Sequence, residues 1–193
     1  MAPVMANDTQ QRILEACSIC IARDGVRGMR VQDVCRQAGI STGLVYYHFT
    51  DRDGLLAATL EYVNTDSVAT REEPAAGGSD SHAMLRELLL AEIQDHESVR
   101  AKSIVWNEIR AIAVFEPPLA AHLAASTAAW QAHVAELVKG HTGGPVEQCQ
   151  ETALLLTSLV EGLSSRWLSN QLDTVAARAA LERGFEAILP AHG

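Results

Sequence analysis

The stretch of residues 31–55 constrains the fold most, because it carries the pattern of two short helices joined by a tight turn. Apolar residues recur at helical spacing over residues 31–38, and Gly39 then permits the positive φ angle that ends a helix. In the segment that follows, Val45 and Phe49 are four residues apart and therefore fall on the buried side of a second helix. The stretch predicts a helix-turn-helix.

The second helix of this pair is expected to have a polar and aromatic outer side. Ser41 or Thr42 can cap its N-terminus, and Ile40 is expected to fill the corner between the two helices. The residues left for the outer side are Thr42, Gly43, Tyr46, Tyr47 and His48. Hydroxyl groups of this kind suit contact with phosphates.

A specific resemblance is carried by residues 38–55, AGISTGLVYYHFTDRDGL. This segment resembles the DNA-binding signature of the TetR family of bacterial transcriptional regulators, and the resemblance covers roughly residues 9–60. The rest of the chain carries no comparable motif. The resemblance implies that this remainder is all-helical, dimerises and holds a small-molecule pocket.

The resemblance also implies a role for each residue of the DNA-reading face. Gly43 lets the backbone approach a base closely, and the base-reading residues are expected to be Thr42 and Leu44. Phosphate contacts are expected from Ser41, Tyr46, Tyr47, His48 and Arg52. Two of these residues have ordinary structural alternatives, Tyr46 as a core aromatic residue and His48 as a cation at the C-terminus of a helix.

Arg30 departs from the family pattern. The family usually has a threonine at this position, which caps the following helix and presents its N-terminus to a phosphate, whereas an arginine cannot supply the same short cap. We hypothesise that the guanidinium of Arg30 reaches a phosphate directly. Arg36, on the outer side of the same helix, is expected to be an ordinary solvated charge.

Charge is distributed unevenly along the chain. The formal net charge of −9 argues by itself against a nucleic-acid-binding protein. Residues 26–52, however, contain four arginines against two aspartates, a local net charge of +2. An acidic remainder repels phosphate from the other faces of the protein, so the asymmetry favours an oriented encounter with DNA and a steep salt dependence.

Helical periodicity recurs along the whole chain and predicts an all-α fold of about nine helices, with no convincing strand. The first helix is expected over residues 9–24 with its end at Gly25, and Asp51 is expected to cap the fourth. Residues 71–81 combine proline, glycine and charged residues and predict a loop. The later helices are expected within residues 82–96, 98–115, 118–138, 145–170 and 174–189.

This pattern divides the chain into three parts. We expect a flexible N-terminus over residues 1–8 and a helix-turn-helix DNA-binding domain over residues 9–55. Residues 56–193 are expected to form a larger helical domain for effector binding and dimerisation.

The expected dimer interface lies in the last two helices. They resemble the two helices that meet their symmetry mates in a four-helix interface in the family. The residues expected to pack this interface are Ala153, Leu156, Val160, Leu163 and Trp167.

An effector pocket is expected between the helices of the larger domain, lined by apolar and aromatic residues with a few polar groups. The candidates are Met84, Trp106, Asn107, Glu108, Arg110, Phe115 and Trp130. Helical spacing does not separate the lining of a cavity from a filled core, so ordinary core or surface positions are the alternative interpretation.

The remaining chemical residues do not form a convincing site. Cys17 and Cys20 have the spacing of redox and zinc motifs but lie on the apolar stripe of the first helix, so packing is favoured and thiol sensing is the alternative. No second ligand pair accompanies them and no two histidines are four residues apart, so no metal and no cofactor are expected. No catalytic motif is present, so an enzyme is not expected.

The sequence thus predicts a dimeric TetR-like transcriptional regulator, by default a repressor, that binds a pseudo-palindromic double-stranded DNA operator and is released by an unknown small-molecule effector. The alternatives are a constitutive DNA-binding protein without an effector and an activator on the same scaffold. No apolar run reaches the length of a membrane span and the N-terminus lacks a secretory pattern, so we expect a cytoplasmic protein without a membrane partner.

Overall fold

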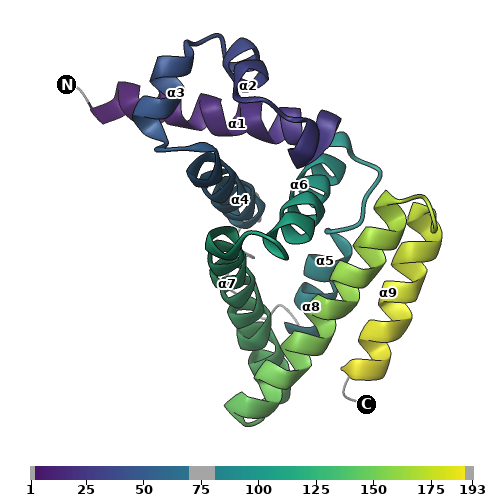
Figure 1. The fold of residues 1–193 in the computed structure, drawn as a ribbon. Helices are drawn as coiled ribbons and strands as arrows, with labels where there is room; N and C mark the ends of the chain where they lie inside the picture. The colour runs from purple at the N-terminus through teal and green to yellow at the C-terminus, as the bar shows by residue number, and fades with distance from the viewer. Residues whose placement is uncertain (1–2, 70–80, 190–193) are drawn as a thin grey trace. The chain divides into compact units, whose positions relative to one another are not determined.

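The structure is a computed structural model that describes residues 3–69 and 81–189. Within these ranges the chain forms nine helices and no strand, which confirms the predicted all-α class (Figure 1). The loop predicted over residues 71–81 lies outside the described residues except for its last member. The helices are α1 (Pro3–Gly28), α2 (Val31–Ala38), α3 (Thr42–His48), α4 (Arg52–Ala69), α5 (Ser81–Leu90), α6 (Glu97–Ala113), α7 (Pro117–Thr142), α8 (Val146–Leu168) and α9 (Thr174–Ile188).

The chain divides into two compact units. The first consists of Met1–Arg71 and Ile104–Ser126, and therefore contains α1 to α4 with the adjoining parts of α6 and α7. The second consists of Glu72–Ser103 and Thr127–Gly193. This division differs from the boundary predicted after residue 55, because the buried side chains of α4 belong to the same core as the helix-turn-helix.

The first helix begins earlier than predicted. α1 starts at Pro3, so the expectation of a flexible N-terminus over residues 1–8 is corrected for residues 3–8, which are helical. Proline is tolerated in a first helical turn because its missing N–H has no partner there. At the other end, Gly25 has φ 70° and ψ 163°, so regular helix geometry breaks where the sequence predicted, and a short helical turn continues to Gly28.

One apolar core holds the first unit together. The stripes predicted on α1 and α4 both face it, and the hydroxyl of Thr59 on α4 donates to the Leu55 carbonyl at 2.8 Å, so this buried polar group is satisfied. The α1 and α4 side chains buried here include Ile13, Cys17, Cys20, Ile21, Leu55, Leu56, Leu60 and Val63.

The second unit has its own core, in which α9 packs along α8 and against α5. Its largest fully buried side chains include Leu85, Leu156 and Phe185. Arg178 on α9 donates through Nη1 to the carbonyls of Leu90 and Ile93, at 2.5 and 2.9 Å. These bonds satisfy carbonyls at the C-terminal end of α5, which have no partner within their own helix.

The residues predicted to form the dimer interface are corrected by their burial. Ala153, Leu156, Val160 and Trp167 have 0, 0, 6 and 2% of their surface exposed within a single chain, and Leu163 packs against the same core. Their helical spacing is real, but it marks the side of α8 that the chain covers with its own helices. The exposed apolar residues of α8 are instead Val146, Leu154 and Leu155.

All four cysteines are free thiols in buried positions, as the packing interpretation predicted. Burial raises the pKa of the Cys17 thiol to about 12, and burial likewise raises the pKa of Cys20. Thiolate is the reactive form of cysteine, so a raised pKa makes these thiols inert at neutral pH. None of the described helices is long and apolar enough to cross a membrane.

Candidate nucleic-acid interface

The turn between α2 and α3 has the geometry that the sequence predicted. Gly39 has φ 66° and ψ 39°, the left-handed conformation that glycine adopts without steric cost. The N–H of Ile40 then donates to the Cys35 carbonyl at 3.0 Å, which closes the end of α2, and the Ile40 side chain packs against the core of the unit. This closure fixes the direction in which the chain enters α3.

The start and the inner side of α3 are equally well defined. The Ser41 hydroxyl accepts a hydrogen bond from the Leu44 N–H at 3.3 Å and so caps the helix. Val45 and Phe49 are buried, with 1 and 5% of their surface exposed. These two side chains hold α3 against the core and turn its opposite side outward.

The outer side of α3 is exposed along its whole length. Tyr47 has 81% of its surface exposed and Tyr46 has 47%, which excludes the core alternative for Tyr46. The ring of His48 lies edge-on to the ring of Tyr47, with centroids 5.2 Å apart. Ser41, Thr42 and Gly43 are exposed, and Leu44 is half-buried.

Gly43 has no structural reason within the chain to lack a side chain. A Cβ atom built at this position meets only the Ser41 hydroxyl, at 4.0 Å, and the backbone of Gly43 is helical rather than left-handed. A glycine inside a helix costs about 1 kcal/mol relative to alanine. The position therefore fits close approach of something outside the chain.

Arg30 and Arg52 are placed differently by the structure. Arg30 is the exposed N-cap residue of α2 and makes no side-chain capping bond, as its departure from threonine predicted. Arg52 is half-buried, and its Nη2 atom donates to the Val26 carbonyl at 2.5 Å. A guanidinium has five N–H donors, so this bond is compatible with a phosphate contact by the same side chain.

Two residues that support the interface were not assigned this role from the sequence. Arg12 on α1 donates through Nη2 to the Ala38 carbonyl at 2.7 Å, and so holds the end of α2 beside the turn. Glu108, listed among the pocket candidates, accepts a hydrogen bond from the Val26 N–H at 2.8 Å instead. Both bonds join residues distant in the sequence, and no local pattern signals them.

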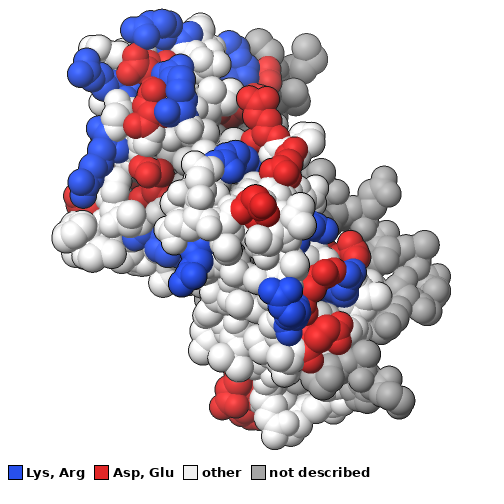
Figure 2. All heavy atoms as spheres, turned by 90° about the vertical axis from the view of Figure 1, so that its right-hand side faces the viewer, with Lys and Arg blue, Asp and Glu red and all other residues white. Residues whose placement is uncertain are grey.

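Charged side chains are mixed on the surface. On the face shown in Figure 2, lysine and arginine side chains gather toward the top, where α1 to α3 lie in Figure 1, with acidic side chains among them. Arg36 is one exposed cation of this region and forms an i, i+3 ion pair with Asp33 at 2.9 Å, which agrees with its prediction as a solvated charge. The local excess of arginine is therefore partly neutralised.

The candidate effector residues do not form one cavity. Met84 and Trp130 belong to the second unit, whereas Trp106, Asn107 and Arg110 belong to the first. Phe115 has 71% of its surface exposed beyond the end of α6, so its assignment as a pocket-lining residue is corrected. The apolar character that suggested a lining reflects partial packing of Trp106 and Trp130 against the two separate cores.

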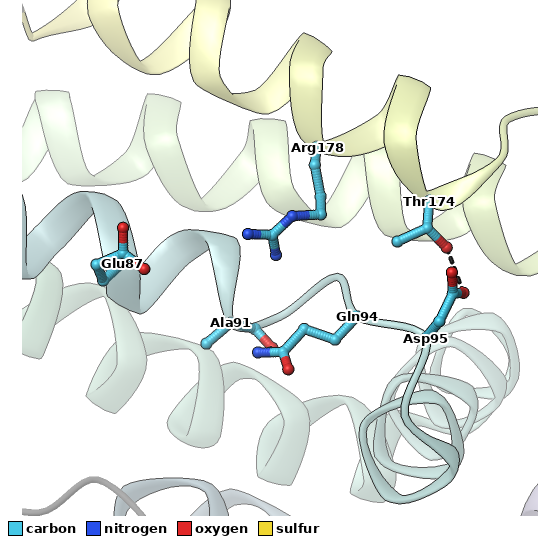
Figure 3. Close-up of a pocket in the computed structure, with 6 residues that line it drawn as sticks. All are labelled: Glu87, Ala91, Gln94, Asp95, Thr174 and Arg178. Carbon is cyan, nitrogen blue, oxygen red and sulfur yellow. Dashed lines mark hydrogen bonds between the residues drawn. The ribbon is translucent and has the colours of Figure 1, made fainter.

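Two hollows in the second unit are lined by other residues. One, of about 350 Å³, lies between α5 and α9, and its polar groups largely bond to the chain itself (Figure 3). Arg178 reaches across it from α9, and the Thr174 hydroxyl donates to the Asp95 carboxylate. The other, of about 500 Å³, lies between α7 and α8. No group of three or more metal-ligating side chains occurs among the described residues.

This arrangement, a capped and exposed α3 set on a glycine turn, defines a helix-turn-helix DNA-binding protein. Two family models match the chain: "Bacterial regulatory proteins, tetR family" over residues 13–59 and "BetI-type transcriptional repressor, C-terminal" over residues 81–190. The chain belongs to the TetR family of transcriptional regulators.

Individual relatives agree with this assignment. The chain is 30% identical to the HTH-type transcriptional regulator BetI of Burkholderia thailandensis over 173 residues, 86% of each protein. A crystal structure of a putative TetR-family transcriptional regulator from Rhodococcus sp. is 42% identical, with a TM-score of 0.85 over 95% of this chain and 99% of that one. A putative transcriptional regulator from Saccharomonospora viridis, solved in complex with choline, is 20% identical, with a TM-score of 0.73 over 93 and 96% of the two chains. The last similarity shows the fold alone.

Proposed function

We propose that this regulator is a homodimeric repressor that places α3 of each subunit in successive major grooves of a pseudo-palindromic operator and is released by a small-molecule effector. The observation that carries the DNA-binding part is the outer side of α3, where exposed hydroxyl groups surround a glycine that the fold itself does not require. A helix in the major groove needs this combination of close backbone approach and phosphate donors.

The proposed contacts follow the two kinds of DNA recognition. Thr42 and Leu44, beside Gly43 at the start of α3, read base edges. Phosphates are bound by Arg30, Ser41, Tyr46, Tyr47, His48 and Arg52. Phosphate contacts fix the register of the protein on DNA, and base contacts select the sequence.

Binding to the intergenic DNA upstream of the protein's own gene tests this proposal. We expect a sequence-specific complex whose affinity falls steeply with salt. Tyr47→Phe removes one hydroxyl from an exposed side chain and should weaken binding to operator and to unrelated DNA alike, whereas Thr42→Ala should change the preference among operator variants. Absence of any salt-sensitive specific complex refutes the DNA-binding proposal, and equal effects of Thr42→Ala on every sequence refute the base-reading role.

The proposed dimer uses α8 and α9 through their exposed apolar residues rather than through the buried stripe. Leu154 and Leu155 have 51 and 57% of their surface exposed, and Val175 on α9 has 77%. Exposed aliphatic side chains on neighbouring helices are the material of a four-helix interface between two copies. The two half-sites of an operator then lie about 34 Å apart, one turn of DNA.

An effector distinguishes the repressor from a constitutive DNA-binding protein. Choline is a reasonable first probe because a protein of the same fold was solved with it. A ligand that binds the folded protein raises its melting temperature, and an inducer also weakens operator binding. If no compound in a screen that includes choline does both, the effector part of the proposal fails while the DNA-binding part stands.

Aromatic faces usually bind quaternary ammonium groups, and two tryptophans of this chain already have an arginine over one face. The Arg110 guanidinium lies 6.0 Å from the ring centroid of Trp106, and that of Arg100 lies 5.1 Å from the ring centroid of Trp167. A cationic effector at either ring has to use the other face or displace the arginine.

A further inference from the structure

A single peptide segment joins three helices of the first unit at Val26. This residue follows Gly25, where the regular geometry of α1 breaks, and its side chain is fully buried. Its N–H donates to the Oε2 atom of Glu108 on α6 at 2.8 Å, and its carbonyl accepts from Nη2 of Arg52, the first residue of α4, at 2.5 Å. Both polar atoms of one buried residue are thus bound by charged side chains from two other helices.

The Glu108 contact follows from the break at Gly25. Because Gly25 leaves the helical conformation, the N–H of Val26 stands at the start of the short helical turn that ends at Gly28, where donors lack partners within the helix. A carboxylate at a helix N-terminus supplies a charge-assisted hydrogen bond and also favours the helix dipole. Glu108 therefore acts as a cap supplied from a helix more than eighty positions away in the sequence, as the separation of 82 residues shows.

The fit around Glu108 is close enough to require glycine at position 25. A Cβ atom added to Gly25 would lie 2.8 Å from Oε2 of Glu108, closer than unbonded atoms approach, and the φ of +70° disfavours any other residue. Gly25 therefore gives the carboxylate access to the Val26 N–H as well as allowing the turn. Space and backbone conformation point to the same function for this position.

The Arg52 contact links the same point to the DNA-reading helix. Arg52 begins α4 directly after the short connection that leaves α3 at His48, and α2 begins at Val31, five residues after Val26. The position of Val26 consequently constrains the entry to α2 and the exit from α3. Holding Val26 from α6 fixes both ends of the helix-turn-helix.

We propose that Glu108 is the positioning residue through which α6 sets the orientation of the DNA-reading helices, with Val26 and Arg52 as the connection. The inference rests on the proposed DNA-binding function and deepens it. Glu108 itself touches no DNA, so its loss lowers the affinity for operator without removing a phosphate contact. Movement of α6 that withdraws the carboxylate has the same consequence.

Amide hydrogen exchange tests the contact without DNA. In the full-length protein, Glu108→Ala should speed exchange of the Val26 amide at least about tenfold, because the amide loses its acceptor, while amides in the middle of α4 keep their rates. Glu108→Gln retains an acceptor oxygen and should have a smaller effect, which keeps the test valid if the alanine variant folds poorly. Glu116→Ala, at an exposed carboxylate beyond the end of α6, is the matched control. Unchanged exchange at Val26 in both Glu108 variants overturns the inference.

Operator titrations test the consequence. Glu108→Ala should lower operator affinity about tenfold with an unchanged salt slope, since the number of phosphate contacts stays the same. Its effect and that of Arg52→Met should be non-additive, because both act on Val26, whereas its effect and that of Tyr47→Phe should be additive. Faster exchange with undiminished operator affinity also overturns the inference. A wild-type protein without specific binding refutes the proposed function itself, which separates the two failures.

Discussion

Arg30 shows how one substitution changes both a local and a functional argument. It occupies the N-cap of α2 in extended conformation, with φ −111° and ψ 142°, and leaves the helix without a side-chain cap. Threonine, serine or aspartate at this position would satisfy a free N–H of the first turn. The chain has given up that bond for an exposed guanidinium.

Replacing Arg30 by threonine should therefore separate stability from DNA affinity. We expect Arg30→Thr to raise the free energy of unfolding by about 1 kcal/mol through the new cap. If Arg30 binds a phosphate, operator affinity should fall and the slope of log affinity against log salt should become shallower by about 0.9. Urea unfolding and binding titrations at several salt concentrations measure the two effects. Tighter operator binding with an unchanged salt slope would show that Arg30 makes no phosphate contact.

Cys17 allows a pH-dependent prediction, because its pKa is raised from the ordinary 9.0 to about 12 by burial. Above pH 9 the unfolded chain loses this proton while the folded chain keeps it, so the stabilisation present below pH 9 is lost progressively up to pH 12. The free energy of unfolding should fall by up to about 1.4 kcal/mol per pH unit from this group. Urea unfolding between pH 8 and about 10.5 should show a shallower decline for Cys17→Ala than for the wild type. Equal slopes in the two proteins would contradict the prediction.

At the scale of elements, two aspartates cap helices in the same way in the two units. Asp51 accepts from the Gly54 N–H at 2.8 Å at the start of α4, and Asp173 accepts from the Ala176 N–H at 2.7 Å at the start of α9. Each bond satisfies a donor that has no partner within its helix. The two caps are thus a matched pair with different distances from the DNA-reading face along the chain.

Removing either cap should have the same cost in stability but different effects on function. We expect Asp51→Ala and Asp173→Ala each to lower the free energy of unfolding by about 1 kcal/mol. Only Asp51→Ala should also weaken operator binding, because α4 begins directly after α3. Unfolding curves and operator titrations of both variants provide the comparison. Equal losses of operator affinity would show that general destabilisation is responsible.

For the whole molecule, assembly depends on which side of α8 remains exposed. The buried stripe of α8 is covered by helices of the same chain, so a second copy can use only residues such as Leu154 and Leu155. A fully apolar set of side chains that already has partners contributes nothing to a new interface.

Leu155→Lys should therefore weaken the dimer at least about tenfold, because a charge in an apolar interface costs free energy unless it is paired. The fold should be retained, since Leu155 has 57% of its surface exposed. Sedimentation equilibrium measures the association, and operator affinity should decline with it. Val114→Lys, at a valine with 74% of its surface exposed after α6, is the control and should stay dimeric. An unchanged dimer in Leu155→Lys would place the interface elsewhere.

Local pattern was sufficient for the helix-turn-helix. Gly39 ends α2, Ser41 caps α3, and Val45 and Phe49 return to the core, all through interactions within a few residues. Helical periodicity likewise predicted the all-α class and the stripes of α1 and α4. These features are determined by the sequence because steric limits, capping and side-chain spacing act over one or two turns of chain.

Tertiary structure decided what periodicity leaves open. The stripe of α8 could face another helix of the chain or another copy, and only its burial assigns it to the protomer's own core. The candidate pocket residues separated into two units, and Glu108 proved to bind Val26 across 82 residues. A side chain's spacing determines which residues share its face, but the partner of that face depends on long-range packing, which a local pattern does not contain.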